Sequence, residues 1–163
     1  MLLVSKLAVG VAESDPSLNL GYEFEEQDLN NADFGIQGFA YKKVNSAVAV
    51  KQGSPVGDLG VSGGNNVTAA QATSGAKGIC QGAGGISTIA VGAGVVKYGF
   101  VQIEGVNRYA AQCTGAVAAG VHVEWSGNDT IIALATAGNE FGHTSIVAAA
   151  GLIPAGGLRI FGA

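Results

Sequence analysis

Glycine is the feature that most restricts what this chain can fold into. The sequence contains 27 glycines among 163 residues, more than twice the share of about 7% in an average protein. From Gly38 onward the glycines divide the chain into short apolar runs and leave no long amphipathic window for a helix. Short runs with frequent glycine turns are typical of sandwiches and barrels. The sequence therefore predicts an all-β fold, a compact β-sandwich or β-barrel with short strands.

One hairpin is predicted with particular clarity. Residues 121–125 read VHVEW, in which apolar residues alternate with His122 and Glu124, the period-two pattern of a half-buried strand. A turn at 126–129 follows, and residues 130–135 (TIIALA) return as the partner strand. Residues 144–152 have some helix propensity, but β-branched residues begin the segment and Gly151 interrupts it. The expected core residues are Trp125, Val121, Val123, Ile131 and Ile103.

The first 37 residues differ from the rest. Seven of the twelve acidic residues fall within 13–33, where glycine is nearly absent. We interpret residues 1–37 as an N-terminal strand followed by an extended acidic arm or long loop, with a short helical turn around 24–29. Residues 38–163 form the Gly/Ala-rich β domain. The arm either reaches a neighbouring subunit or is a solvated surface loop, and both alternatives remain open.

The β domain contains a faint internal similarity. Residues 49–83 and 117–148 both read as strand, turn, strand, glycine-containing link and strand. A duplicated unit explains this pattern.

Low charge restricts the classes of partner. Charged residues make up 12% of the chain, hydrophobic residues 48%, and the net charge is −4. A surface poor in charge suits contact with another protein, because few charges need to be desolvated; the alternative is that it is simply uncharged. Lys42 and Lys43 are the only adjacent cations, so we expect no nucleic-acid binding. The apolar start, 1–12, has no basic residues ahead of it, and no run of about 18 apolar residues occurs, so we expect neither an export signal nor a membrane span.

No set of residues predicts catalysis. His122 and Glu124 share a strand face, but no nucleophile elbow of the G-x-S-x-G type accompanies them. The glycine clusters 82–85 and 92–94 lack the Lys-Ser/Thr of a phosphate-binding loop. We therefore expect neither an enzyme nor a bound cofactor.

Metal binding is not expected either. Cys80, Cys113, His122 and His143 lack the paired spacing of zinc ligands. The acidic residues of 23–28 lack the register and glycine of a calcium loop. The spacing of Cys80 and Cys113 leaves their pairing open, and their flanking residues, which are typical of buried strands, favour two buried thiols.

The texture of the β domain resembles that of small phage head decoration (cement) proteins. Residues 111–135 (AQCTGAVAAGVHVEWSGNDTIIALA) resemble their recurring unit, residues 48–72 resemble a looser form of it, and 150–163 resemble their closing strand. The resemblance runs from Gly38 to the C-terminus, and the acidic N-terminal segment has no counterpart. It implies a virion protein, assembled in the host cytoplasm, that binds the outer capsid surface between major capsid subunits. It also implies self-association, as a homotrimer rather than a dimer, and stabilisation of the shell.

The residues that we expect to contact a partner lie near the two ends of the chain. The alternative function is another virion part, a tail, fibre or adhesin domain that binds a host surface. Glycan binding of that kind needs exposed aromatic rings, whereas the only tryptophan, Trp125, is predicted to point inward. The predicted contact residues are Tyr22, Phe24, Asp28 and Phe34 in the arm, and Arg159 and Phe161 in the C-terminal segment.

Overall fold

The computed structural model describes residues 9–28, 30–58, 65–69, 85–126, 130–133, 135, 140, 142–148 and 151–160. These residues form an all-β fold, as predicted, whose strands join in one sheet in the order β1-β2-β4-β3-β5-β6-β12-β10-β8-β9-β7-β11. The strands are β1 (Glu23–Gln27), β2 (Ile36–Asn45), β3 (Pro55–Asp58), β4 (Asn66–Ala69), β5 (Gly85–Ser87), β6 (Val96–Val106), β7 (Ala111–Cys113), β8 (His122–Ser126), β9 (Thr130–Ala133), β10 (Gly142–Thr144), β11 (Gly151–Ile153) and β12 (Leu158–Ile160).

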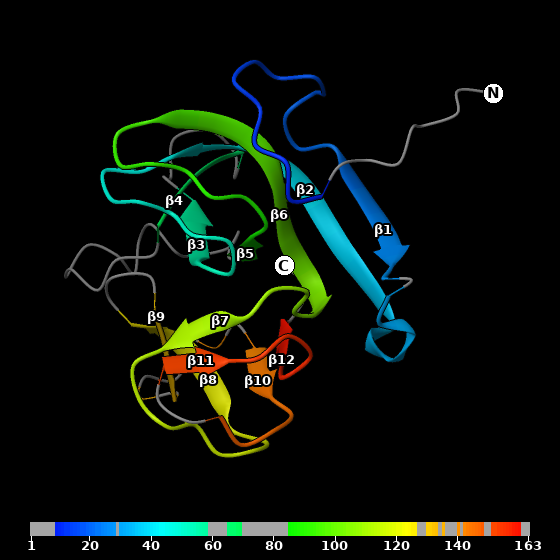
Figure 1. Ribbon diagram of the computed structural model, residues 1–163, viewed down its shortest axis with the longest axis vertical. Helices are drawn as coiled ribbons and strands as arrows, with labels where there is room; N and C mark the ends of the chain where they lie inside the picture. The colour runs from blue at the N-terminus through cyan, green and yellow to red at the C-terminus, as the bar shows by residue number, and fades with distance from the viewer. Residues whose placement is uncertain are drawn as a thin grey trace.

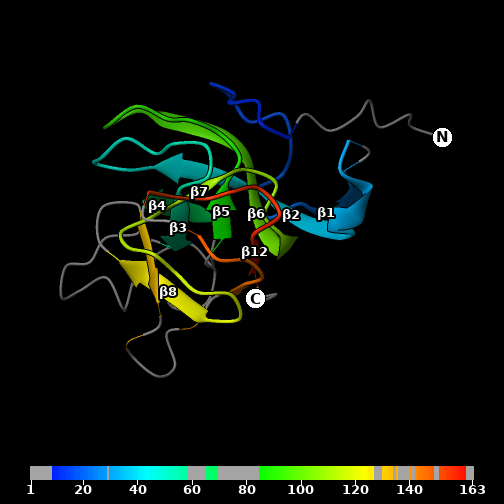
Figure 2. The same cartoon turned by 60° about the horizontal axis from the view of Figure 1, so that its bottom comes forward.

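The first barrel consists of β2, β4, β3, β5 and β6. Its long strands β2 and β6 pair antiparallel and close the ring, and they lie side by side in Figures 1 and 2. β2 also pairs parallel with β4, whereas the other neighbours in the ring are antiparallel. Small and β-branched side chains fill a narrow barrel of this kind. The buried residues inside it are Val44, Val50, Val56, Val67, Ile89, Val91 and Val101.

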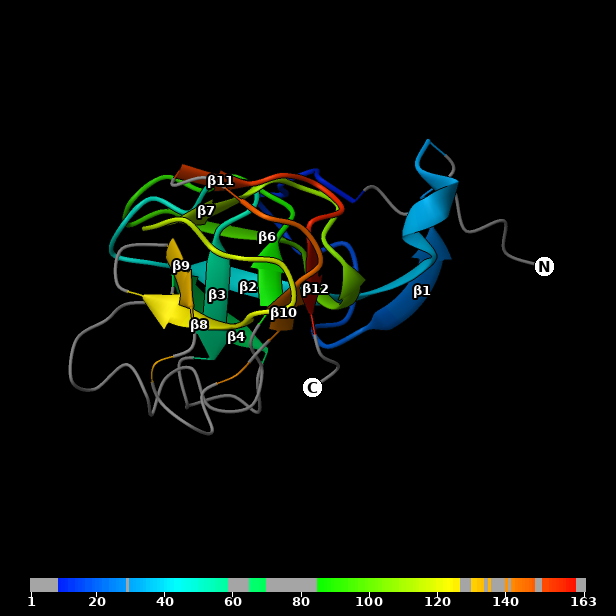
Figure 3. The ribbon, with the colours of Figure 1, turned by 90° about the horizontal axis from the view of Figure 1, so that it is seen from below.

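One prediction for the N-terminal segment is wrong, and residues 1–8, part of the predicted N-terminal strand and arm, lie outside the described residues. The helical turn expected around 24–29 is wrong, because Glu23–Gln27 form strand β1, paired antiparallel with the first half of β2. The only helix in the described residues is a 3-10 turn, η1 (Ala32–Phe34). β1 and η1 stand at the margin of the molecule, on the side away from β8 and β9 (Figure 3). No described helix has the length and hydropathy needed to cross a membrane.

The second lobe, β7 to β12, repeats the pairing order of the first barrel. β7 pairs parallel with β9, as β2 does with β4, and β9, β8 and β10 then follow as antiparallel neighbours. β11 pairs with β7, and β12 pairs with β10. In the first barrel one long strand, β6, pairs with both corresponding strands, β2 and β5, so β11 and β12 together correspond to β6. β12 also pairs with the end of β6, which joins the two parts into one sheet.

Each part contains a pair of facing turns. Val50 and Val91 exchange two backbone hydrogen bonds of 2.8 Å, and Val117 and Ala148 do the same at 2.9 and 3.0 Å. A glycine with positive φ follows each of these four residues after three positions, at Gly53, Gly94, Gly120 and Gly151. We call residues 46–53 with 88–94 the first turn pair, and 114–120 with 145–148 the second turn pair.

The predicted hairpin is confirmed. β8 and β9 pair with Trp125 opposite Ile131 and Ser126 opposite Thr130. Val123 and Ile131 are fully buried, as expected, in a second apolar cluster that belongs mainly to the second lobe. Val121 is half-buried against this cluster, and Ile103 is half-buried against the cluster of the first barrel. The Trp125 side chain lies outside the part that the structure describes.

The burial of Glu124 differs from the prediction that one face of β8 is exposed. Its side chain is only 6% exposed, although it belongs to the face of β8 that was predicted to be polar. His122, two residues earlier on that face, is exposed.

Candidate functional site

Residues 9–22 lie against the outside of the first barrel and are attached to it through Glu13. Glu13 forms an isolated antiparallel bridge with Tyr98 of β6, with N···O distances of 2.8 and 2.9 Å. Its carboxylate accepts hydrogen bonds from the hydroxyls of Tyr41 and Ser17. The Tyr41 hydrogen bond is the main cause that lowers the pKa of Glu13. Burial, and then the bond to Glu13, raises the pKa of Tyr41, so the proton stays on the tyrosine at neutral pH.

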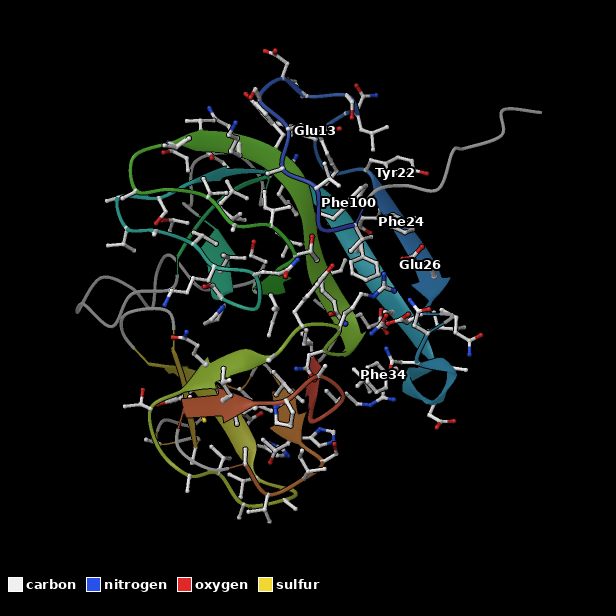
Figure 4. All side chains as sticks on the ribbon, viewed as in Figure 1. Glu13, Tyr22, Phe24, Glu26, Phe34 and Phe100 are labelled. Carbon is white, nitrogen blue, oxygen red and sulfur yellow. The ribbon has the colours of Figure 1, made fainter. Side chains whose placement is uncertain are left out.

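Aromatic rings connect β1 to the barrel (Figure 4). Phe24 lies at their centre, with its ring centroid 5.3 Å from that of Phe39 and 4.9 Å from that of Phe100. Tyr22 stacks on Phe24 at 6.4 Å, and Tyr41 meets Phe100 at 5.3 Å. Two of the predicted contact residues therefore have different environments. Tyr22 is exposed at the end of the cluster, and Phe24 is half-buried within it.

Arg108 binds the inner face of β1 from the linker between β6 and β7. Its guanidinium group donates hydrogen bonds to Glu26 and, from Nε at 2.9 Å and from a terminal nitrogen at 2.6 Å, to Gln37 Oε1. Its Nε lies 3.9 Å from Asp28 Oδ2. Its guanidinium carbon lies 4.7 Å from the centroid of the Phe39 ring. The side chain is thus enclosed by two carboxylates, an amide and a ring.

Asp28, a predicted contact residue, directly follows β1 and participates in a turn. Its carboxylate accepts hydrogen bonds from the Asn30 N–H at 3.0 Å and from Asn31 Nδ2 at 3.1 Å. Partial burial alone raises the pKa of Asp28, but these hydrogen bonds and the charge of Arg108 outweigh it and lower the pKa. The carboxylate is therefore charged at neutral pH.

Two of the remaining predicted contact residues, Phe34 and Arg159, lie closer to the second lobe. Phe34 sits against the β11–β12 turn, since a Cβ added to Gly156 would lie 2.6 Å from its ring. Arg159 is exposed on β12, opposite Val106. Phe161 lies outside the described residues. Tyr22, Phe24 and Phe34 thus follow one another along β1 and the turn after it (Figure 4), and Asp28 directly follows β1. The contact of all four with a partner stays a prediction.

The histidines face each other across two strands. His122 of β8 is paired with His143 of β10, with ring centroids 6.2 Å apart. His122 Nδ1 lies 3.9 Å from a carboxylate oxygen of Glu140. Among the described residues no three His, Cys, Asp or Glu side chains group as metal ligands. Cys113 is buried and Cys80 lies outside the described residues, so their pairing remains untested.

Exposed apolar side chains gather at the turn pairs and at the strand starts beside them. Six of the ten large ones in the described residues lie there: Val48, Val95 and Val96 at the first turn pair, and Ile146, Val147 and Leu152 at the second, where Val147 is 74% exposed. The other four, Val11, Leu20, Tyr22 and Ile36, lie in residues 9–22 or at the start of β2. The neighbouring exposed residues are mostly alanine and glycine, and the second turn pair contains no charged residue.

Sequence reasoning missed Arg108, Glu13 and the turn pairs. Arg108 gave no local signal, because its partners Gln37 and Glu26 lie 71 and 82 residues away in the chain. The turn pairs did leave a signal, a valine or alanine followed after three positions by glycine, at 50–53, 91–94, 117–120 and 148–151. Comparisons of the chain with protein-family models and with curated proteins gave no match in either case.

Proposed function

We propose that this protein is a capsid decoration protein that binds the outer surface of a phage head between major capsid subunits and stabilises the shell. The resemblance of residues 111–135 and 48–72 to the recurring unit of such proteins supports the choice of partner. The exposed apolar side chains on two similar turn pairs support a contact role. Large exposed apolar groups with uncharged neighbours commonly mark protein contact sites.

Binding through the turn pairs requires little desolvation of charge. Lys51 is the one charged residue within the first turn pair, and the second has none, so burying them removes mainly apolar surface from water. The reciprocal hydrogen bonds between facing turns hold each turn pair in one conformation. A preorganised surface of this kind loses little conformational entropy on binding.

Two similar surfaces on one chain also suit a repetitive shell. Each contact can be weak, because linked contacts on one particle add through multivalency. We propose that the protein acts as a homotrimer rather than a dimer, which multiplies the number of such surfaces in one assembly.

Co-sedimentation with heads stripped of their decoration tests this function. The purified chain should bind saturably, at a copy number that matches a symmetry site of the capsid. Val147→Asp places a charge in the most exposed apolar position of the second turn pair and should weaken binding at least about tenfold, because a buried valine contributes about 1.5 kcal/mol or more. Val11→Asp changes an exposed valine outside the turn pairs and should bind as the native chain does.

Either of two results would contradict the proposal. A native chain that stays in the supernatant at micromolar concentration has no capsid role, and binding to host cell surfaces, as for a tail, fibre or adhesin domain, would then be measured. Full binding by Val147→Asp, equal to that of Val11→Asp, would exclude the second turn pair from the contact and contradict the proposed contact surface.

A further inference from the structure

Strand β1 has one edge that no described strand occupies. β1 stands first in the strand order, and β2 is the only strand that pairs with it in the described part of the chain. The first half of β2 pairs with β1 along the same edge on which its second half pairs with β4. β1 therefore extends the wall of the first barrel outward by one strand, at the margin of the molecule (Figure 3).

The phase of the ladder determines which backbone groups of β1 point outward. The Tyr41 N–H donates to the Tyr22 carbonyl at 2.8 Å, so Tyr22 and Tyr41 are a hydrogen-bonded position of this antiparallel pair. Phe24 and Glu26 come two and four residues later and are opposite Phe39 and Gln37. Because hydrogen-bonded positions alternate along an antiparallel ladder, Phe24 and Glu26 direct their N–H and C=O groups toward β2.

Glu23, Glu25 and Gln27 occupy the other positions, so their N–H and C=O groups point away from β2. This row of outward groups has the geometry for adding a strand. The side chains of Glu23 and Glu25 are exposed and lie on one face of the edge. On the opposite face lie Tyr22 and Phe24.

These two faces specify the chemistry of an added strand. Residues placed beside Glu23 and Glu25 would be cross-strand neighbours about 5 Å away, where opposite charges attract. Alternate residues would face Tyr22 and Phe24, where apolar side chains pack best. The matching segment therefore alternates basic and apolar residues. A second copy of β1 does not match, because glutamates would then meet glutamates.

We infer that the free edge of β1 binds an extended partner segment of alternating basic and apolar residues, which adds to the sheet as a further strand. The identification of its owner rests on the proposed function, in which the segment belongs to the capsid shell. β1 is already formed before binding, since Phe24 is packed in the aromatic cluster and Glu26 is bound to Arg108. Only the partner segment has to be ordered, which lowers the entropic cost.

A blocked octapeptide of alternating lysine and valine is the direct probe. Added to the full chain, it should slow amide hydrogen exchange at Glu23 and Glu25, because their N–H groups become hydrogen-bonded. An octapeptide of alternating glutamate and valine, which has the same alternation and the opposite charge, should bind at least about tenfold more weakly, since like charges would then stand opposite Glu23 and Glu25.

Two substitutions of Glu25 distinguish the contribution of its charge to peptide binding from the contribution of its outward backbone N–H. Glu25→Ala removes a carboxylate and keeps the outward N–H, so binding should weaken severalfold and depend less on salt, with Glu23 still charged. Glu25→Pro also removes the outward N–H, which the β1–β2 ladder does not use, and should abolish binding. Should Glu25→Pro fail to fold, the exchange pattern and the comparison of the two peptides decide the question alone.

Equal binding of both peptides, protection elsewhere than β1, or full binding by a folded Glu25→Pro would each overturn the inference. Stripped heads distinguish this failure from failure of the proposed function. Heads that bind the native chain and Glu25→Pro equally would leave the capsid role intact and exclude the β1 edge. Peptide protection at β1 without any binding to heads would retain the edge site and exclude the capsid.

Discussion

The guanidinium group of Arg108 lies over the ring of Phe39, with 4.7 Å between its carbon and the ring centroid. Phe39 is fully buried on β2, and the same guanidinium group donates to Glu26 of β1. The backbone N–H of Arg108 donates to the buried Gln102 of β6 at 2.9 Å. One residue of the linker between the first barrel and the second lobe therefore attaches β1, β2 and β6 to one another.

Replacement of Arg108 should destabilise the whole chain. We expect Arg108→Ala to lower the free energy of unfolding by about 2–4 kcal/mol, because it removes hydrogen bonds to charged groups and a cation–π contact. Arg108→Lys keeps the charge but loses the planar fork and should cost about half as much. Arg159→Ala removes an exposed arginine and should stay within about 0.5 kcal/mol of the native chain. Urea denaturation measures all three, and an unchanged Arg108→Ala would contradict this account.

Acid should weaken the attachment of residues 9–22. The pKa of Glu13 is lowered from its ordinary 4.5 in the folded chain, so the stability that it contributes is fully present above about pH 4.5. That stability is lost as the pH falls through the folded pKa. Glu13→Gln keeps a hydrogen-bond acceptor for Tyr41 without the titration, and its stability should depend less steeply on pH in this range. The pKa of Asp28 is also lowered in the folded chain, so part of the dependence of stability on pH should remain in Glu13→Gln. Denaturation at a series of pH values checks the difference.

Alkaline pH should lower the stability through Tyr41, the hydrogen-bond partner of Glu13. The pKa of Tyr41 is raised above its ordinary 10.0, so its contribution is present below pH 10 and is lost as the pH rises through the folded pKa. Tyr41→Phe should therefore flatten the loss of stability above pH 10. Tyr109 also has a raised pKa and should account for the remainder. Denaturation at a series of alkaline pH values measures this, and an equal loss of stability in both chains would argue against the Tyr41–Glu13 hydrogen bond.

Two glycines at equivalent positions of the first turn pair should differ in their tolerance of a side chain. Gly53 and Gly94 both have positive φ, but a Cβ at Gly53 would lie 1.9 Å from the carbonyl oxygen of Ala110, whereas Gly94 has open space. Gly94→Ala should cost about 1 kcal/mol, the backbone penalty alone. Gly53→Ala should cost about 3 kcal/mol, because backbone atoms must also move. Thermal unfolding of both variants tests the difference, and equal losses would be inconsistent with the close approach.

The fold class and the β8–β9 hairpin could be predicted because their signals are local. Alternation over 121–125 and the following turn determine a strand and its partner without distant information. β1 could not be predicted in this way, since 24–29 read FEEQDL and favour a helix by propensity. Pairing with β2 and the contacts of Phe24 with Phe39 and Phe100 outweigh that propensity.

The candidate site shows the same difference between local signals, which the sequence reveals, and distant contacts, which it does not. Tyr22, Phe24, Asp28 and Phe34 were chosen from a composition change, and they lie along one strand and turn, because neighbours in sequence remain neighbours in space. Arg108 and Gln37 are 71 residues apart, and no periodicity reports such a pair. Alternation likewise shows that two faces of β8 differ, but not that the polar face is covered at Glu124 while His122 stays exposed, and so the burial of Glu124 was missed.

Because of the position of Ile86, we expect the first barrel and the second lobe to unfold together. It belongs to β5 of the first barrel, yet its fully buried side chain packs in the apolar cluster of the second lobe, with Val123 and Ile131. Ile86→Ala should lower the free energy of unfolding by about 2–5 kcal/mol and keep one transition, because both parts lose the same contact. Trp125 fluorescence reports on β8, and amide exchange in β2 reports on the barrel, so both probes should shift to the same lower urea concentration. Ile36→Ala, at a position 66% exposed, serves as the matched control and should shift neither. Separate transitions for the two probes would show that the parts fold independently in spite of the shared side chain.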